Sequence, residues 1–309
     1  MKYLVTGGAG FIGSHIAEAL VKRGHKVRVL DNLSTGSMDN LSSIASYIEY
    51  QQGDITRHDD VANAVEGQDI VFHEAALRSV ARSIDNPFSS NEINVDGTLR
   101  LLEACRKARV KRVVYASSSS VYGDNIKYPQ VETMRASPIS PYAVSKLAGE
   151  HYHIVFSKTF GLETVSLRYF NVFGPRQHPE SQYAAVIPKF MQAAMQGHPL
   201  EVHSDGKQSR DFTYIDNVVQ ANLLAASRPK VQGEYFNIAN GKNYSLLDII
   251  KVIEKLAGHN LKRHHLAARA GDIRKTWADI RKAKRLLGYK PTVGFEEGLE
   301  RTWEWFKNQ

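Results

Sequence analysis

A glycine-rich turn close to the start of the chain restricts its fold more than any other feature. The turn runs from Gly7 to Gly13, between the strand-like run Tyr3-Leu4-Val5 and a helical pattern over residues 14–23. Glycines permit a tight turn and let backbone N–H groups approach a pyrophosphate at the N-terminus of the helix. A tight turn that binds nothing is the plain alternative. The residues expected at a dinucleotide are Gly7, Gly10, Phe11, Ile12 and Gly13.

An aspartate after the next strand-like run favours a dinucleotide and indicates which one. Asp31 follows Gly13 by 18 residues, close to the spacing of about 20 that dinucleotide-binding units show. A carboxylate there accepts hydrogen bonds from the adenine ribose and repels a 2′-phosphate, so we expect NAD rather than NADP, with Asn32 beside it. Asp54 and Ile55 are expected near the adenine, although an ordinary turn explains Asp54 nearly as well.

The first half of the chain alternates short β-branched runs with helical patterns, which is the rhythm of βαβ units. We therefore predict an α/β fold: a Rossmann-type doubly wound parallel sheet with a smaller, mostly helical C-terminal substrate lobe. The expected division is residues 1–170 for the NAD-binding domain and 171–309 for the substrate lobe, and the pattern leaves open that later segments return to the sheet. The predicted strands are residues 3–5, 27–30, 48–50, 70–72, 113–115 and 163–167.

The amino-acid composition limits which kinds of partner the chain can bind. The net charge is +8, but the basic residues are spread among 32 acidic ones, which suits an anionic small substrate and gives no nucleic-acid patch. No apolar run is long enough to cross a membrane, so we expect a soluble, cytoplasmic protein. Cys105, the only cysteine, is expected to be packed on a helix. The histidines at 151, 153, 264 and 265 lack carboxylate or cysteine partners at ligand spacing, so we expect no metal.

Three side chains form a candidate catalytic group. If Pro141 occupies the first turn of a helix, Tyr142 and Lys146 lie on one face of it, and an ammonium there favours the phenolate. A phenolate beside a nicotinamide can remove a hydroxyl proton while hydride leaves the same carbon. Ser118 ends the fifth strand and can hold that hydroxyl. Each of these motifs occurs often by chance when taken alone. Their combined order and spacing after the glycine turn argue against chance as the explanation.

Four motifs together resemble the extended short-chain dehydrogenases and, among them, the nucleotide-sugar 4-epimerases. They are Thr6 to Gly13, Ser117 to Gly123, Tyr142 to Lys146, and Leu167 to Pro175. The resemblance spans essentially the whole chain. It implies Ser118 and Tyr142 at the reacting O4, Lys146 on the nicotinamide ribose, and Asn94 and Tyr169 near the cofactor. It also implies Asn171, Arg210 and Arg269 at the diphosphate, Asp272 on the uridine ribose, and a homodimer formed by helices at about 93–108 and 141–158.

The residues after the catalytic serine limit the reaction. Relatives that eliminate water or carbon dioxide have acids where this chain has Ser119 and Ser120. The resemblance therefore implies an isomerase whose chemistry stops at C4. Hydride passes to a tightly held NAD, the 4-keto sugar rotates about its diphosphate link, and hydride returns to the opposite face of the sugar. A regulatory protein that senses NAD without catalysis is the alternative from another class, but it has no use for Ser118, Tyr142 and Lys146 together.

The sugar is predicted from fewer residues. In galactose-type epimerases a bulky tyrosine often walls the pocket where this chain places Thr276, and a smaller residue leaves room for an acetamido group. Val186 and Arg78 lie in segments that resemble enzymes acting on UDP-N-acetylglucosamine. We therefore expect UDP-N-acetylglucosamine and UDP-N-acetylgalactosamine as substrates, with UDP-glucose and UDP-galactose as further candidates. The serine run is instead similar to that of UDP-glucuronate 4-epimerases, which keeps UDP-glucuronate as the alternative.

Overall fold

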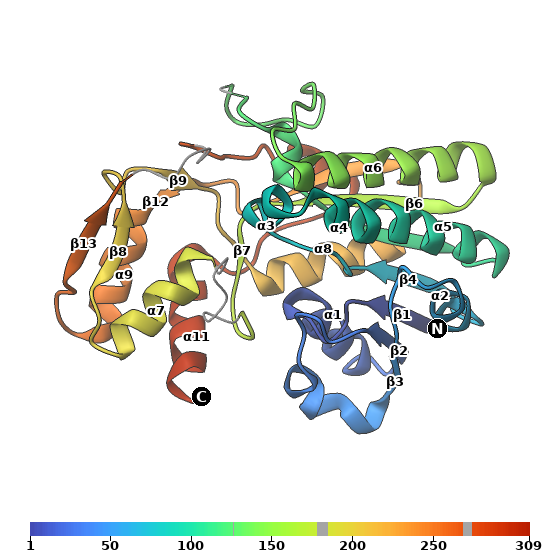
Figure 1. Cartoon of the computed structure of the whole chain (residues 1–309), viewed down its shortest axis with the longest axis horizontal. Coiled ribbons are helices and arrows are strands. Elements are labelled where there is room, and N and C mark those ends of the chain that lie inside the picture. Colours follow the sequence, from blue (N-terminus) through green and yellow to red (C-terminus); the bar gives the residue numbers. More distant parts are fainter. Residues whose placement is uncertain (126, 178–184, 268–273) are drawn as a thin grey trace.

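The computed structural model describes residues 1–125, 127–177, 185–267 and 274–309. Its centre is a parallel sheet of seven strands in the order β11-β6-β5-β4-β1-β2-β3 (Figure 1). The six predicted strands are confirmed and lie side by side in it. The strands are β1 Lys2–Thr6, β2 Lys26–Asp31, β3 Ile48–Gln52, β4 Ile70–His73, β5 Arg112–Ser118, β6 Glu163–Tyr169 and β11 Glu234–Ile238.

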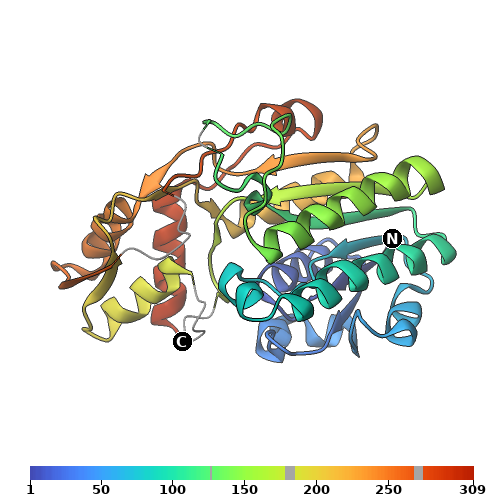
Figure 2. The same cartoon turned by 45° about the horizontal axis from the view of Figure 1, so that its top comes forward.

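Helices cover both faces of this sheet, and the central strands β1, β4, β5 and β6 are buried along almost their whole length. On one face α5 and α6 run side by side, as both views show (Figures 1 and 2), while α1 and α8 cover the other face. Neighbouring strand residues divide between the faces: Leu4 packs into the α5 and α6 side with Cys105, and Val5 into the opposite core. The covering helices and turns are α1 Phe11–Val21, η1 Met38–Tyr47, α2 His58–Val65, α3 Val80–Asp85, α4 Pro87–Asn91, η2 Glu92–Asp96, α5 Gly97–Lys107, η3 Ser119–Tyr122, α6 Pro141–Phe160 and α8 Ile215–Ser227.

A second group of elements forms a smaller lobe beside the sheet, at the left of Figure 1. Two of its strands, β8 and β13, pair in parallel, and the helices α7, α9 and α11 pack around them. The elements of the later chain outside the sheet layers are β7 Val172–Phe173, α7 Val186–Met195, β8 Leu200–His203, β9 Ser209–Arg210, β10 Thr213–Tyr214, β12 Tyr244–Ser245, α9 Leu246–Ala257, β13 Arg263–Leu266, α10 Arg281–Leu286 and α11 Phe295–Lys307.

Part of the later chain returns to the sheet. Strand β11 pairs with β6 along Val165 to Tyr169, and α8 packs across β5 and β6. The Rossmann-type fold is therefore confirmed, and its last strand comes from beyond residue 170. The division of the chain into residues 1–170 and 171–309 stays a prediction.

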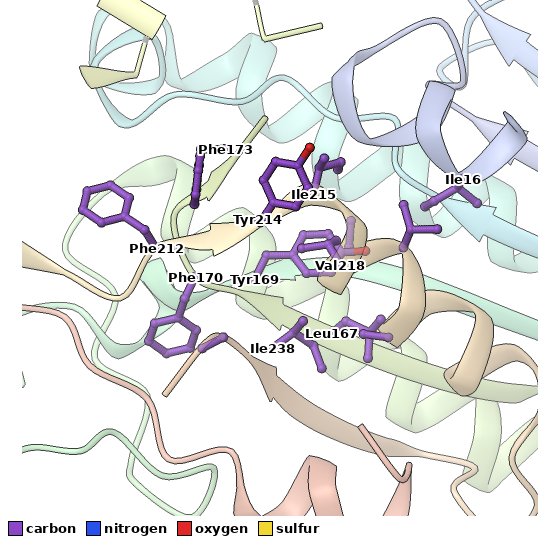
Figure 3. Close-up of a cluster of buried hydrophobic side chains, with 14 of the residues drawn as sticks. Ile16, Leu167, Tyr169, Phe170, Phe173, Phe212, Tyr214, Ile215, Val218 and Ile238 are labelled. Carbon is purple, nitrogen blue, oxygen red and sulfur yellow. The ribbon is translucent and has the colours of Figure 1, made fainter. Parts of the chain in front are cut away.

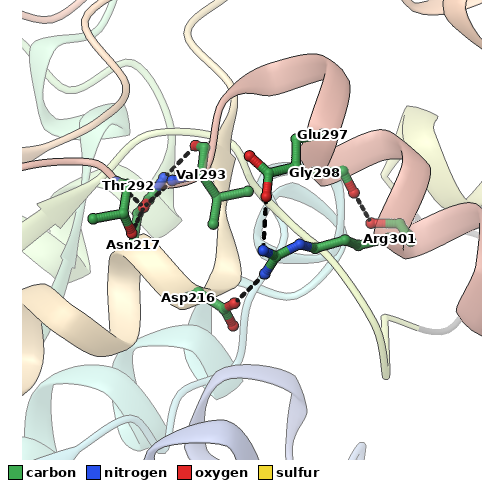
Figure 4. Close-up of polar contacts among 8 residues, drawn as sticks. Asp216, Asn217, Thr292, Val293, Glu297, Gly298 and Arg301 are labelled. Carbon is green, nitrogen blue, oxygen red and sulfur yellow. Dashed lines mark hydrogen bonds and ion pairs between the residues drawn. The ribbon is translucent and has the colours of Figure 1, made fainter.

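Aromatic packing and a small polar cluster connect the lobe to the sheet. Phe173 contacts Phe212 and Tyr214 edge to face, with ring centroids 6.3 and 5.6 Å apart, just before Ile215 begins α8 (Figure 3). Asn217 of α8 accepts the backbone N–H groups of residues 292 and 293, and Arg301 of α11 bridges Asp216 and Glu297 (Figure 4). These contacts fix α11 against α8. No helix of the described residues is long and apolar enough to cross a membrane.

Candidate active site

The glycine turn forms a cradle that has no room for side chains. Gly7 has a φ of 66°, and a Cβ on it would lie 2.7 Å from the backbone nitrogen of Ala75. A Cβ on Gly13 would overlap the carbonyl oxygen of Gly7. Helix α1 begins at Phe11, has Gly10 as its N-cap with no side-chain cap, and carries no acidic residue in its first turn. The uncapped, positively polarised helix end fits the pyrophosphate of NAD.

The carboxylate of Asp31 lies beside this cradle. Its oxygens accept the backbone N–H groups of Ala9 (2.9 Å) and Leu33 (2.8 Å), and burial raises its pKa. Asn32, the next residue, donates its amide to Asp54 at 2.7 Å, which links the ends of β2 and β3. Asp54 also accepts the N–H and hydroxyl of Thr56, as a turn aspartate does. An additional contact of Asp54 with adenine stays a prediction.

The other expected cofactor residues line the same end of the sheet or support it. Ile55 is buried in the core. Asn94 is buried too, and its amide is fully engaged with the backbone of Leu77 and with the Ser145 hydroxyl. It thereby ties the segment after β4 to α6. Phe11 and Ile12 are half-buried in the first turn of α1.

The structure brings the three predicted catalytic side chains together where β5 ends and α6 begins. Helix α6 starts at Pro141, as predicted, and the hydroxyl of its N-cap Ser140 accepts an N–H of the first turn. The Lys146 Nζ lies 5.9 Å from the ring centroid of Tyr142 and donates to the Ala116 carbonyl oxygen at 2.8 Å. Ser118 is the last residue of β5.

The surroundings of Tyr142 act on its pKa in both directions. Burial raises the pKa above the ordinary value of 10, and the hydrogen bond with Ser118 and the charge of Arg78 oppose this rise. The Lys146 ammonium donates to the backbone of β5, and its expected effect on the Tyr142 phenolate stays a prediction. Burial lowers the pKa of Lys146 to about 8, and the charge of Glu74 opposes that fall.

A buried ion pair behind the site escaped the sequence analysis. Glu150, two turns beyond Tyr142 on α6, accepts Arg168 Nε at 2.8 Å and Nη2 at 2.7 Å, and the hydroxyl of Ser117 at 2.5 Å. The guanidinium lies between the rings of Tyr122 and Tyr235, 4.8 and 4.4 Å from their centroids. We call Ser117, Glu150 and Arg168 the buried clamp. It joins β5, α6 and β6, each of which carries a predicted site residue.

Glu74 also escaped the sequence analysis. It follows β4 and accepts the hydroxyl of Tyr169 at 2.9 Å. The available signal was its place directly after a buried strand, at the sheet edge where ligands of such folds bind. Ser119 and Ser120, which did attract attention, form the short turn η3, where the N–H of Ser120 bonds to Ser118 Oγ at 3.1 Å.

A cavity of about 730 Å³ lies between the sheet domain and the smaller lobe, a size typical of small-molecule sites. Three predicted substrate residues, Asn171, Val186 and Arg210, line it. Thr276 is buried behind Asn171, and its hydroxyl accepts the Asn171 amide at 3.0 Å. Arg269 and Asp272 lie outside the described residues. Among the described residues, no cluster of His, Cys, Asp and Glu is arranged to hold a metal ion.

Comparison with known proteins identifies the family. A family model described as the NAD dependent epimerase/dehydratase family matches residues 3–239. This chain belongs to that family. The predicted relationship to the extended short-chain dehydrogenases of the nucleotide-sugar 4-epimerase group is confirmed, as is NAD as the cofactor.

Similar epimerases carry different substrate names. A putative UDP-glucose 4-epimerase of Methanocaldococcus jannaschii is 37% identical over 308 residues, which cover 99% of this chain and 98% of the relative. A UDP-glucuronate 4-epimerase of Thermodesulfobacterium geofontis is 36% identical and is covered to 96%, against 99% of this chain. The solved structure of UDP-N-acetylglucosamine 4-epimerase from Methanobrevibacter ruminantium, in complex with UDP-N-acetylmuramic acid, has a TM-score of 0.95 and 40% identity, covering 100% of this chain and 98% of that one.

Proposed function

We propose that this epimerase interconverts UDP-N-acetylglucosamine and UDP-N-acetylgalactosamine, with UDP-glucose and UDP-galactose as further substrates. At the coarser level the chain is an isomerase, an NAD-dependent UDP-sugar 4-epimerase. The observation that carries the choice of sugar is Thr276. By the resemblance, this small side chain corresponds to the bulky tyrosine that walls the pocket of galactose-type relatives. In support, Thr276 is hydrogen-bonded to the cavity residue Asn171.

The proposed chemistry uses the three side chains gathered at the end of β5. NAD, held at the glycine turn, would supply the acceptor and donor of hydride for C4 of the sugar. Ser118 holds the O4 hydroxyl, and Tyr142 removes its proton and later returns it. Lys146 holds the nicotinamide ribose and adds positive charge to the site. Positions 119 and 120 carry no acidic residue, so neither of them can supply an acid for an elimination reaction. The 4-keto sugar instead rotates about its diphosphate link within the cavity.

We propose that this cavity binds the diphosphate of the substrate. Arg210 and Asn171 are the proposed phosphate contacts. Arg210 is the second residue of β9, and its pairing with Tyr244 of β12 fixes its backbone. A guanidinium suits the charge and geometry of a diphosphate. Val186, at the start of α7, and Val80 of α3 supply apolar surface on facing elements, which suits an acetamido methyl group.

UDP-glucuronate is the second candidate, and one observation favours it. The hydroxyl of Ser120 is buried and has no hydrogen-bond partner among the described residues. It lies in η3, two residues after Ser118, and this hydroxyl can donate a hydrogen bond to a C6 carboxylate. The same hydroxyl could instead bond to O6 of a neutral hexose, so this observation weighs less than Thr276.

The substrate is tested by incubating the purified enzyme, without added NAD, with UDP-N-acetylglucosamine, UDP-glucose and UDP-glucuronate separately. Inversion at C4 is followed by NMR. We expect the largest kcat/KM for UDP-N-acetylglucosamine. Preference for UDP-glucuronate would replace the proposal by its second candidate. No inversion of any of the three sugars would support the NAD-sensing alternative.

We also propose that the enzyme is a homodimer. Several apolar side chains on α6 are exposed, among them Val144 (52%), Val155 (47%) and Phe160 (50%). Such residues on a helix at the protein surface suit a helix of a second copy. Light scattering on the purified protein tests this, and a mass of one chain would contradict it. A cytoplasmic location stays a prediction.

A further inference from the structure

Glu74 stands at the point of the sheet where the strand order reverses. Strands β1 and β4 are neighbours there, with later strands on one side and earlier strands on the other. The backbone N–H of Glu74 donates to the Thr6 carbonyl oxygen at 3.2 Å, and the carbonyl carbon of Glu74 would lie 3.0 Å from a Cβ on Gly7. In open α/β sheets ligands bind in this crevice. The side chain of Glu74 therefore starts from the wall of the dinucleotide site.

The carboxylate of Glu74 ends a chain of buried hydrogen bonds. Asn222 of α8 is fully buried and donates its amide to the Tyr169 hydroxyl at 2.8 Å. Two acceptors lie within reach of the Tyr169 O–H, Glu74 Oε1 at 2.9 Å and Asn222 Oδ1 at 3.1 Å. The nearer acceptor, and the only one of the two that carries a negative charge when ionised, is Glu74, which therefore favours a Tyr169 hydroxyl directed to the predicted nicotinamide end of the crevice.

The charged and titratable groups that face Glu74 come from three elements. They are Lys146 and Tyr142 of α6, Tyr115 of β5, and Tyr169 of β6. Burial raises the pKa of Glu74 to about 7, against the effects of the Tyr169 hydrogen bond and the Lys146 charge. Glu74 in turn is the charge that opposes the fall of the Lys146 pKa.

Resting on the function proposed above, we propose that Glu74 is a positioning residue of the epimerase reaction. Its carboxylate orients the Tyr169 hydroxyl and places a negative charge at the same end of the crevice as Lys146 and Tyr142. Above about pH 7 the Glu74 carboxylate is ionised and supports the lysine. Below that pH Glu74 is neutral, and a glutamine has the same shape and the same charge.

The first test compares wild type, Glu74→Gln and the exposed control Glu66→Gln as holoenzymes. At about pH 6 we expect E74Q and wild type to have the same kcat within about twofold, because Glu74 is then protonated. At about pH 8.5 we expect E74Q to fall about fivefold below wild type, because loss of the Glu74 charge lowers the pKa of Lys146 further and leaves less of the lysine charged. KM and the control should not change. A ratio of kcat values that is constant with pH would overturn the inference.

A second readout does not depend on turnover. A carboxyl group whose folded pKa of about 7 exceeds its ordinary 4.5 stabilises the fold at low pH and loses that contribution as pH rises to 7. Glutamine does not titrate, so the Tm of E74Q should equal that of wild type at about pH 5 and exceed it above about pH 7. A purely structural role predicts a lower Tm for E74Q at every pH, and that outcome would also overturn the inference.

Tyr169→Phe provides an independent variant. Loss of the Tyr169 hydroxyl removes a hydrogen bond that lowers the Glu74 pKa. In the Y169F background, the pH at which the kcat of the E74Q variant falls below that of its Glu74 parent should therefore move upward. An unchanged divergence pH would contradict the proposed chain of hydrogen bonds. Failure of the proposed function would give a different result from failure of this inference. Wild type would then invert no UDP-sugar, while the Tm comparison would still test the role of Glu74.

Discussion

Glu150→Gln removes the negative charge at the centre of the buried clamp and keeps the shape of the side chain. Glu150 is 1% exposed, Arg168 and Ser117 are 3% exposed, and the two Arg168 bonds measure 2.7 and 2.8 Å. The variant leaves a buried guanidinium without its counter-charge, and breaking such a pair costs about 3 to 5 kcal/mol of unfolding free energy. With an unfolding entropy of about 2.1 cal/mol/K per residue over 309 residues, Tm should fall by about 5 to 8 °C.

The assay is thermal unfolding of the holoenzyme followed by circular dichroism, with kcat measured on the same samples. We expect kcat to fall as well, because Ser117 precedes Ser118 and Glu150 lies one helical turn beyond Lys146. Glu297→Gln is the matched control. Its partner Arg301 lies at the surface, where both side chains are about half exposed (Figure 4), so the control should cost less than about 1 kcal/mol.

A double variant separates charge from packing. Glu150→Leu with Arg168→Met removes both charges together, and such replacements of buried pairs are often neutral or stabilising. We therefore expect the double variant to melt above E150Q. The reasoning is refuted if E150Q melts within about 2 °C of wild type, which corresponds to about 1 kcal/mol for a chain of this length.

Three further predictions concern the site itself. Tyr142→Phe should keep the fold and bound NAD but lose at least about a hundredfold in kcat, since it removes the acid and base, and full activity would show that another base operates. Gly13→Ala should abolish retention of NAD by a protein that still folds, because the new methyl overlaps the Gly7 carbonyl; NAD content after purification measures this, and stoichiometric NAD would contradict it. Thr276→Tyr should reduce kcat/KM more for UDP-N-acetylglucosamine than for UDP-glucose. The control Thr276→Val keeps the size of the side chain but loses the hydrogen bond with Asn171, so it should affect both sugars alike. Equal effects of T276Y on both sugars would remove the main reason for preferring UDP-N-acetylglucosamine.

The parts of the fold that local patterns encode could be predicted from the sequence. The strands from β1 to β6 each contain a short run rich in β-branched or aromatic residues. The turn from Gly7 to Gly13 needs glycine because side chains at Gly7 and Gly13 would overlap the backbone. The start of α6 follows from Pro141, whose ring suits the first helical turn. Periodicity does not say which sheet a later segment joins, so the return of β11 next to β6 could only be left open.

The parts that depend on tertiary contacts were not predicted. Glu150 and Arg168 stand 18 residues apart, and neither the helix nor the strand pattern indicates that they pair. Burial and the charge of Arg78, which lies far from Tyr142 in the sequence, both act on the Tyr142 pKa, and the spacing of Tyr142 and Lys146 cannot show either influence. The place of Glu74 after a buried strand was a signal of its position, but its contact with Tyr169 depends on the fold.

The central claim is that one bound NAD removes and returns the hydrogen at C4 within a single site. The most direct measurement uses a UDP-sugar deuterated at C4, incubated with the enzyme in ordinary water without added NAD. The account predicts a C4-inverted product that keeps its deuterium, with no net NADH released. Loss of the deuterium to solvent, or a 4-keto-6-deoxy product, would contradict it.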